Sequence, residues 1–102
     1  MKQTEVISAL RAHEDELRQA GIVSLSVIGS VARGDDSPDS DVDLVVRLTD
    51  AARQGGFAYV GRLDRLRRRL EEILTRRVDL IAEPIRKERL RHEIEKDRVL
   101  AF

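Results

Sequence analysis

The segment from Gly29 to Leu44, which reads GSVARGDDSPDSDVDL, constrains the fold of this chain more than any other part of the sequence. A Gly-Ser pair precedes, by ten residues, an Asp-x-Asp pattern formed by Asp41 and Asp43. Side chains alternate between the two faces of an extended strand, so these carboxylates project to the same side, roughly 6.5–7 Å apart at the backbone. Two carboxylates held that way repel each other unless a cation lies between them. Mg²⁺ typically binds one or two carboxylates together with phosphate oxygens.

The Gly29–Ser30 pair stands at the end of a predicted strand, immediately before a short predicted helix. Unpaired backbone N–H groups at such a strand-to-helix turn favour the binding of phosphate. Together, the pair and the two carboxylates predict a site for a divalent metal ion and a triphosphate.

Two strand patterns flank this motif. Residues 22–28 alternate apolar side chains with serine, which predicts a half-buried strand. Residues 31–33 predict one helical turn, and residues 34–40 predict a loop because Gly, Pro, Asp and Ser dominate there. Residues 41–47 predict a second strand. Its two faces carry Val42, Leu44 and Val46 on one side and Asp41, Asp43 and Val45 on the other.

Helical patterns surround these strands. Residues 4–20 carry apolar side chains near helical spacing, and Gly21 predicts the end of that helix. After a connection at residues 48–58, residues 59–75 predict a long helix. The apolar stripe of this long helix consists of Val60, Leu63, Leu66, Leu70, Ile73 and Leu74.

The last part of the chain predicts one more strand and one more helix. Residues 77–82 predict the strand, and Pro84 fits the first turn of a helix that ends near residue 97, because the missing N–H has no cost there. The order of all these elements predicts an α/β or α+β sheet with helices packed on it.

Asp79 is a charged residue in the middle of this short apolar strand, between Val78 and Leu80. Such a charge is costly unless it is paired or binds metal. Taken alone, Asp79 is as well explained by an exposed strand edge or by an arginine partner. Beside Asp41 and Asp43, it predicts three carboxylates converging on a pair of cations suited to in-line phosphoryl displacement.

Composition limits the class of protein. The 102 residues predict one domain, and the absence of cysteine excludes disulfides and thiolate chemistry. We expect a cytoplasmic protein, because the sequence shows no signal peptide and no run of roughly 20 apolar residues. Residues 61–102 carry 13 Lys and Arg against 9 Asp and Glu, which suits either a solvated helix face or an acidic partner.

The spacing of Gly29-Ser30, Asp41-Val42-Asp43 and the later Asp79 resembles that of the DNA polymerase beta-like nucleotidyltransferase superfamily. The full run GSVARGDDSPDSDVDL is similar to that of the smallest members, the minimal nucleotidyltransferase (MNT) proteins. The resemblance covers residues 22–82 well. It implies a single domain over residues 1–102, in which a small mixed β-sheet has helices packed mainly on one face.

The resemblance also implies a role for each motif residue. Asp41, Asp43 and Asp79 would hold two Mg²⁺ ions, and Asp79 would also orient or deprotonate the acceptor hydroxyl. Gly29 would allow close approach of the backbone to the triphosphate of ATP, and Ser30 would bind phosphate oxygens.

Other polar residues near the motif are open to more than one interpretation. Arg33 either contacts phosphate or braces the loop through Asp35, Asp36 or Asp43, and Ser40 caps or orients the start of the strand. We expect three loop carboxylates to be exposed in turns, those of Asp35, Asp36 and Asp39. The aromatic residues Phe57 and Tyr59 either cover adenine or pack in the core or a loop.

The small size has a consequence for the substrate. The chain shows no second domain to hold an acceptor and no aromatic platform for bases, so we expect a protein partner and no direct nucleic-acid binding. MNT proteins are the antitoxins of two-gene toxin–antitoxin pairs, and the resemblance implies a HEPN-type toxin as partner in a hetero-oligomer. It implies transfer of AMP from ATP to a tyrosine hydroxyl of that toxin. The alternative is an antitoxin that binds nucleotide without turnover and neutralises its partner by occlusion.

Overall fold

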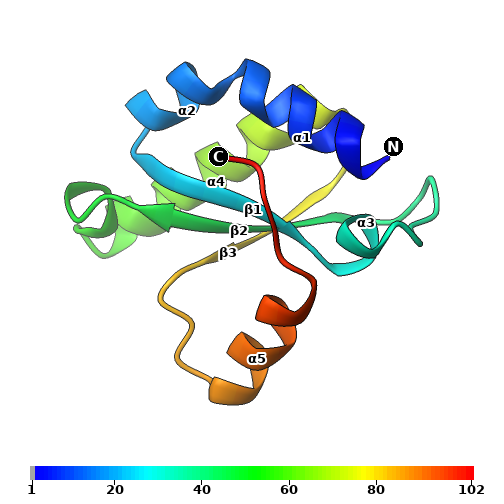
Figure 1. Ribbon diagram of the computed structural model, residues 1–102. Helices are drawn as coiled ribbons and strands as arrows, with labels where there is room; N and C mark the ends of the chain where they lie inside the picture. The colour runs from blue at the N-terminus through cyan, green and yellow to red at the C-terminus, as the bar shows by residue number, and fades with distance from the viewer. Residues whose placement is uncertain (1) are drawn as a thin grey trace.

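The computed structural model describes residues 2–102, which form one four-stranded sheet with helices on both of its faces (Figure 1). The elements follow one another as α1 (Gln3–Ala12), α2 (Glu14–Gln19), β1 (Ile22–Ile28), α3 (Gly29–Arg33), β2 (Val42–Leu48), the 3₁₀ turn η1 (Ala51–Arg53), α4 (Phe57–Leu74), β3 (Val78–Ala82), α5 (Glu88–Asp97) and β4 (Val99–Leu100).

The sheet has the strand order β3-β2-β1-β4 and contains both kinds of pairing. Strand β1 is antiparallel to β2 and to β4, whereas β2 and β3 are parallel and joined by the crossover helix α4. The mixed sheet implied by the resemblance is therefore confirmed. The sequence did not predict strand β4, because a strand of two residues is too short to show an alternating pattern.

The two faces of the sheet are covered unequally. Helices α1, α2 and α4 lie on one face and α5 lies on the other, as Figure 1 shows. The main core lies under the first group and includes Leu10, Leu44 and Leu70, all fully buried. A small second cluster on the α5 side consists of Ile28, Val45 and Ile94, with Ile81 and Ile85 packed against it. Helices thus pack mainly on one face, as expected.

The predicted first helix is wrong in one respect, because it is broken at His13 into α1 and α2. In a continuous helix the His13 N–H would donate to the carbonyl of Ala9. Here the ring Nδ1 of His13 lies 2.9 Å from that carbonyl oxygen, and the backbone N–H donates to Leu10 instead. The His13 ring thus contacts the Ala9 carbonyl that the His13 N–H would bind in a continuous helix. The N–H bonds one residue later instead, so the turn is tighter and α1 ends there.

The predicted burial is wrong at three positions. Ser26 of β1 is fully buried rather than on a solvated face, and its hydroxyl accepts a hydrogen bond at 3.0 Å from Arg98, which precedes the neighbouring strand β4. In α4, Val60 is 61% exposed and Tyr59 packs against the core in its place. Phe57 is 96% exposed at the start of α4, so it packs in neither core nor loop.

The predicted start of the last helix is also wrong. Pro84 lies outside α5, which begins at Glu88. The Glu83 N–H continues the strand ladder by donating to the Val46 carbonyl at 2.9 Å, and the Glu83 carboxylate pairs with Arg98. The chain therefore remains extended past β3 instead of turning into a helix. Within residues 2–102 no helix is both long enough and apolar enough to cross a membrane.

Candidate active site

The register of three adjacent strands brings the motif residues to one end of the sheet. Asp43 is the pairing partner of Asp79 across the parallel strands β2 and β3. It is also the partner of Ile28 across the antiparallel strands β1 and β2. Because Gly29 directly follows Ile28, the row Asp79–Asp43–Ile28 ends at the Gly-Ser pair. Residues far apart in the sequence are thus neighbours at a single location.

Gly29 lies so close to the Asp43 carboxylate that any larger residue would force this carboxylate to move. A Cβ atom at this position would lie 2.4 Å from Asp43 Oδ2, which is well inside van der Waals contact. Gly29 also has a φ of +71°, which side-chain-bearing residues rarely adopt. The glycine lets the end of β1 turn into α3 directly over the carboxylate.

Asp43 experiences the charge of both other motif carboxylates. Its side chain is half-buried, whereas Asp41 and Asp79 are exposed. Burial raises the pKa of Asp43 above its ordinary value, and the negative charges of Asp79 and Asp41 raise it further. Arg33 opposes this shift in pKa. The cluster therefore concentrates negative charge that a bound cation would relieve.

The donor set fits a hard cation held jointly by protein and substrate. In residues 2–102 the structure brings together no group of three or more acidic, His or Cys side chains close enough to coordinate a metal ion by themselves. Mg²⁺ is usually bound by one or two carboxylates plus substrate phosphates rather than by a complete protein cage. None of the ion pairs among these described residues engages Asp41, Asp43 or Asp79. Their oxygens thus remain available as ligands.

Helix α3 places Ser30 beside this cluster. Ile28 caps the five-residue helix without a side-chain hydrogen bond. The Ser30 carbonyl accepts a hydrogen bond from the Asp35 N–H at 3.0 Å, which fixes the following turn. Within the described part of the chain the Ser30 hydroxyl makes no hydrogen bond to protein, and its side chain is half-buried.

Arg33 braces two elements at once. Its guanidinium lies 3.3 Å from Asp35 and 3.2 Å from Asp97, so it links the start of the loop to α5. These hydrogen bonds, the one to Asp97 first, raise the pKa of the exposed Arg33. The predicted bracing through Asp35 is confirmed. The second partner was missed because it lies 64 residues away in the sequence.

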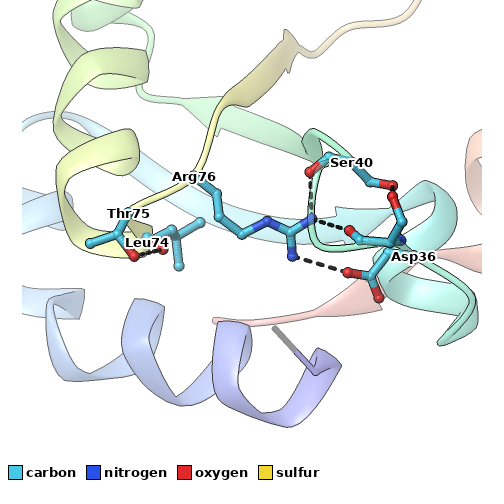
Figure 2. A network of polar contacts seen from close by, with 6 residues as sticks. Asp36, Ser40, Leu74, Thr75 and Arg76 are labelled. Atoms are coloured by element: carbon cyan, nitrogen blue, oxygen red, sulfur yellow. Dashed lines mark hydrogen bonds and ion pairs between the residues drawn. The ribbon is translucent and has the colours of Figure 1, made fainter.

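The loop before Asp41 is held by a buried ion pair that the sequence analysis missed. Asp36, which we expected to be exposed, pairs with Arg76 at 3.0 Å, and both side chains are only 10% exposed. Figure 2 shows the guanidinium reaching the loop from the turn after α4. Ser40 closes the loop by accepting a hydrogen bond from the Ser37 N–H at 3.0 Å. Its hydroxyl thus stabilises the turn that ends just before β2.

Comparison with known proteins assigns the family. Residues 10–101 match the nucleotidyltransferase domain family. The chain belongs to this family. A protein adenylyltransferase, MntA from Thermococcus cleftensis, is 37% identical over 78 residues, which cover 76% of this chain and 73% of MntA. The resemblance inferred from the motif is therefore confirmed.

Solved structures agree on the fold. A structure described as a minimal nucleotidyltransferase superposes with a TM-score of 0.74 and 29% identity, covering 97% of this chain and 95% of the other. A toxin–antitoxin complex with AMP-PNP gives a TM-score of 0.67 at 18% identity, covering all of this chain and 73% of that one. The complex of a tri-AMPylated HEPN toxin with an MNT antitoxin from Shewanella oneidensis gives 0.62 at 17% identity, with coverages of 98% and 71%. Because the sequence identity to the last two structures is only 17–18%, they show similarity of fold alone.

Proposed function

We propose that this chain transfers AMP from ATP to a hydroxyl, that of a tyrosine, on a HEPN-type partner toxin and thereby acts as its antitoxin. The observation that carries the proposal is the pairing of Asp43 with Asp79 beside Gly29, in a chain of the nucleotidyltransferase family. The similarity to a protein adenylyltransferase and to an MNT antitoxin bound to an AMPylated HEPN toxin supports the donor and the partner.

The residues that would hold two Mg²⁺ ions are Asp41, Asp43 and Asp79. Bound magnesium would lower the pKa of the acceptor hydroxyl and offset the negative charge that develops on the transferring phosphoryl group. Burial raises the pKa of Asp43 most, and the negative charges of Asp79 and Asp41 raise it further. This repulsion supports the assignment, because a bound cation would relieve it.

The other motif residues would bind and orient the substrate. Gly29 has no side chain, so the triphosphate can approach the backbone beside Asp43. Ser30 would donate from its hydroxyl and N–H to the β- and γ-phosphate oxygens. Arg33 stays a second candidate for phosphate contact, in exchange for one of its two acidic partners.

In the proposed reaction the acceptor oxygen attacks the α-phosphorus of ATP. A new oxygen–phosphorus bond forms, the bond to the bridging oxygen of the β-phosphate breaks, and pyrophosphate leaves. Asp79 orients the attacking hydroxyl and accepts its proton. Most of the rate enhancement would come from positioning and charge stabilisation rather than from covalent chemistry by the protein.

The decisive experiment measures label from α-³²P ATP in the toxin purified with this chain. We expect incorporation with the parent protein, loss of incorporation with Asp41→Ala plus Asp43→Ala, and a toxin that is heavier by whole AMP units in intact-mass analysis. Asp15→Ala plus Asp50→Ala removes the same charge from two exposed positions away from the motif and serves as the matched control.

The same variants separate catalysis from occlusion. An antitoxin that acts by occlusion would neutralise the toxin equally well with and without Asp41 and Asp43. Full neutralisation by the double variant, with no label in the toxin, would replace the transferase proposal by the binding-module alternative.

A further inference from the structure

Arg76 lies in the turn between α4 and β3 and reaches the loop that precedes Asp41. Helix α4 ends at Leu74, and Thr75 follows in a left-handed conformation with φ +54°. A β-branched residue rarely adopts this conformation, so the surrounding structure must hold it. The reversal directs the Arg76 side chain away from α4 and across to the loop at residues 36–40 (Figure 2).

One guanidinium fastens this loop at three acceptors. Arg76 Nη1 donates to Asp36 Oδ2 at 3.0 Å, and Nη2 donates to the Ser37 carbonyl at 3.1 Å and also to the Ser40 carbonyl. Arginine offers several donors in a fixed planar fork, whereas lysine offers a single point charge. The two Nη atoms bind the carboxylate and the two carbonyls at once, whereas a lysine ammonium would have to serve all three acceptors from one nitrogen.

The attachment points lie next to the motif residues. The Ser40 carbonyl belongs to the peptide group that continues into Asp41, and Arg76 stands three residues before Asp79. A second tie follows at once, since the Val42 N–H donates to the Arg77 carbonyl at 2.9 Å. The two ties together fix the start of β2 against the start of β3.

The Arg76 guanidinium does not satisfy all of its own hydrogen-bond donors in this position. Arg76 Nε is buried and has no partner among residues 2–102. A buried unpaired donor costs free energy. The guanidinium is therefore oriented for its loop contacts at the expense of its own hydrogen bonding.

We propose that Arg76 is a positioning residue that sets the distance between Asp41 and Asp79 and thereby the affinity of the site for a divalent cation. This inference rests on the proposed function and adds to it a residue outside the motif. The loop it holds carries Asp35, Asp36 and Asp39 directly before Asp41, so like-charge repulsion would open the loop without the tie.

The test measures Mn²⁺ binding by electron paramagnetic resonance in the presence of α,β-methylene-ATP, whose α–β bridge cannot be cleaved. For Arg76→Lys we expect the dissociation constant for Mn²⁺ to rise about 10-fold, the lower range for groups that orient metal ligands. In transfer assays, excess Mg²⁺ should restore the rate. Arg98→Lys is the matched control, because Arg98 is also largely buried and binds Ser26, Glu83 and Glu95 away from the motif.

Arg76→Gln tests the sign of the effect. Removing a positive charge near an acidic cluster should tighten cation binding by Coulomb's law, whereas loss of positioning should weaken it. Weaker Mn²⁺ binding by Arg76→Gln supports the proposal, and tighter binding overturns it. Equal Mn²⁺ binding by Arg76→Lys and the parent protein also overturns it.

Two further outcomes remain decisive. If circular dichroism shows that the Arg76 variants do not fold, Asp36→Asn takes their place, and an unchanged Mn²⁺ dissociation constant for that variant overturns the inference. If the parent protein itself binds neither Mn²⁺ nor the nucleotide analogue, the proposed function fails and this inference fails with it.

Discussion

The two faces of strand β2 differ in what they contribute to the molecule. Val42, Leu44 and Val46 point into the main core and are fully buried. The other face carries Asp43 at one end and Val45 beneath α5. Alternate residues of one short strand thus serve stability and the proposed chemistry separately. We expect substitution of the core-facing residues to affect unfolding and substitution of Asp43 to affect transfer.

The largest expected effect is on the acidic face. Asp43→Asn keeps the size of the side chain but removes the charge that would bind the cation. We expect transfer to the partner to fall at least about 1,000-fold, equivalent to ~4 kcal/mol of transition-state stabilisation. Label incorporation measures this, with Asp50→Asn as the control at an exposed site. A variant that retains a tenth of the parent rate would contradict the assignment of Asp43.

The next effect is on the apolar face. Leu44→Ala removes a fully buried side chain from the main core and leaves a cavity. The free energy of unfolding should fall by about 2–5 kcal/mol. Urea denaturation measures this loss, while the transfer rate per folded molecule should stay within a factor of a few of the parent. If transfer fell as steeply as in Asp43→Asn, the two faces would not be separable.

Gly29→Ala tests the contact between Gly29, at the end of β1, and the Asp43 carboxylate on β2. The added Cβ would meet Asp43 Oδ2 at 2.4 Å, and the backbone would keep an unfavourable φ of +71°. We expect a loss of about 1–3 kcal/mol in the free energy of unfolding, together with a reduced transfer rate, because the carboxylate must move. Gly34→Ala is the control, since φ is similar there but a Cβ would meet nothing within 4 Å.

The smallest effect concerns pH in the metal-free protein. Because burial and the neighbouring carboxylates raise the pKa of Asp43 in the folded state, the folded protein binds this proton more tightly than the unfolded chain. Its stability should therefore fall as pH rises from about 4, the ordinary value for Asp, through the raised pKa. Solvent screening at this partly exposed side chain keeps the penalty small.

Asp43→Asn measures this penalty in the presence of a chelator. Its melting temperature should exceed that of the parent slightly at pH 7, and the difference should vanish below about pH 4. A substantially lower melting temperature for the variant at pH 7 would show that the Asp43 charge stabilises the metal-free fold instead.

Local sequence patterns predicted the first three strands and the motif, because each of these is encoded in a short stretch of sequence. The first strand was predicted at its observed bounds, and the second and third to within one residue, since period-two alternation and the flanking Gly and Pro residues define them. The meeting of Asp43 with Asp79 followed from placing both on adjacent strands, and the register confirms that they pair.

Contacts made by single side chains outside any periodic pattern could not be predicted from the sequence. The pair of Asp36 with Arg76 joins positions 40 residues apart, and neither residue stands in a periodic pattern. The break at His13 depends on a side chain that competes for one backbone carbonyl, and propensity does not report such competition. The late start of α5 likewise depends on Glu83, which is held by partners on β2 and at Arg98.

Strand β3 is one of the two edge strands of the sheet, and Asp79 lies exposed on this rim. A residue at a rim is reached from the side and needs no channel or deep hollow. A folded macromolecule can therefore lay one rigid surface along this border and bring a single side chain to Asp79 without unfolding a tail to thread inside.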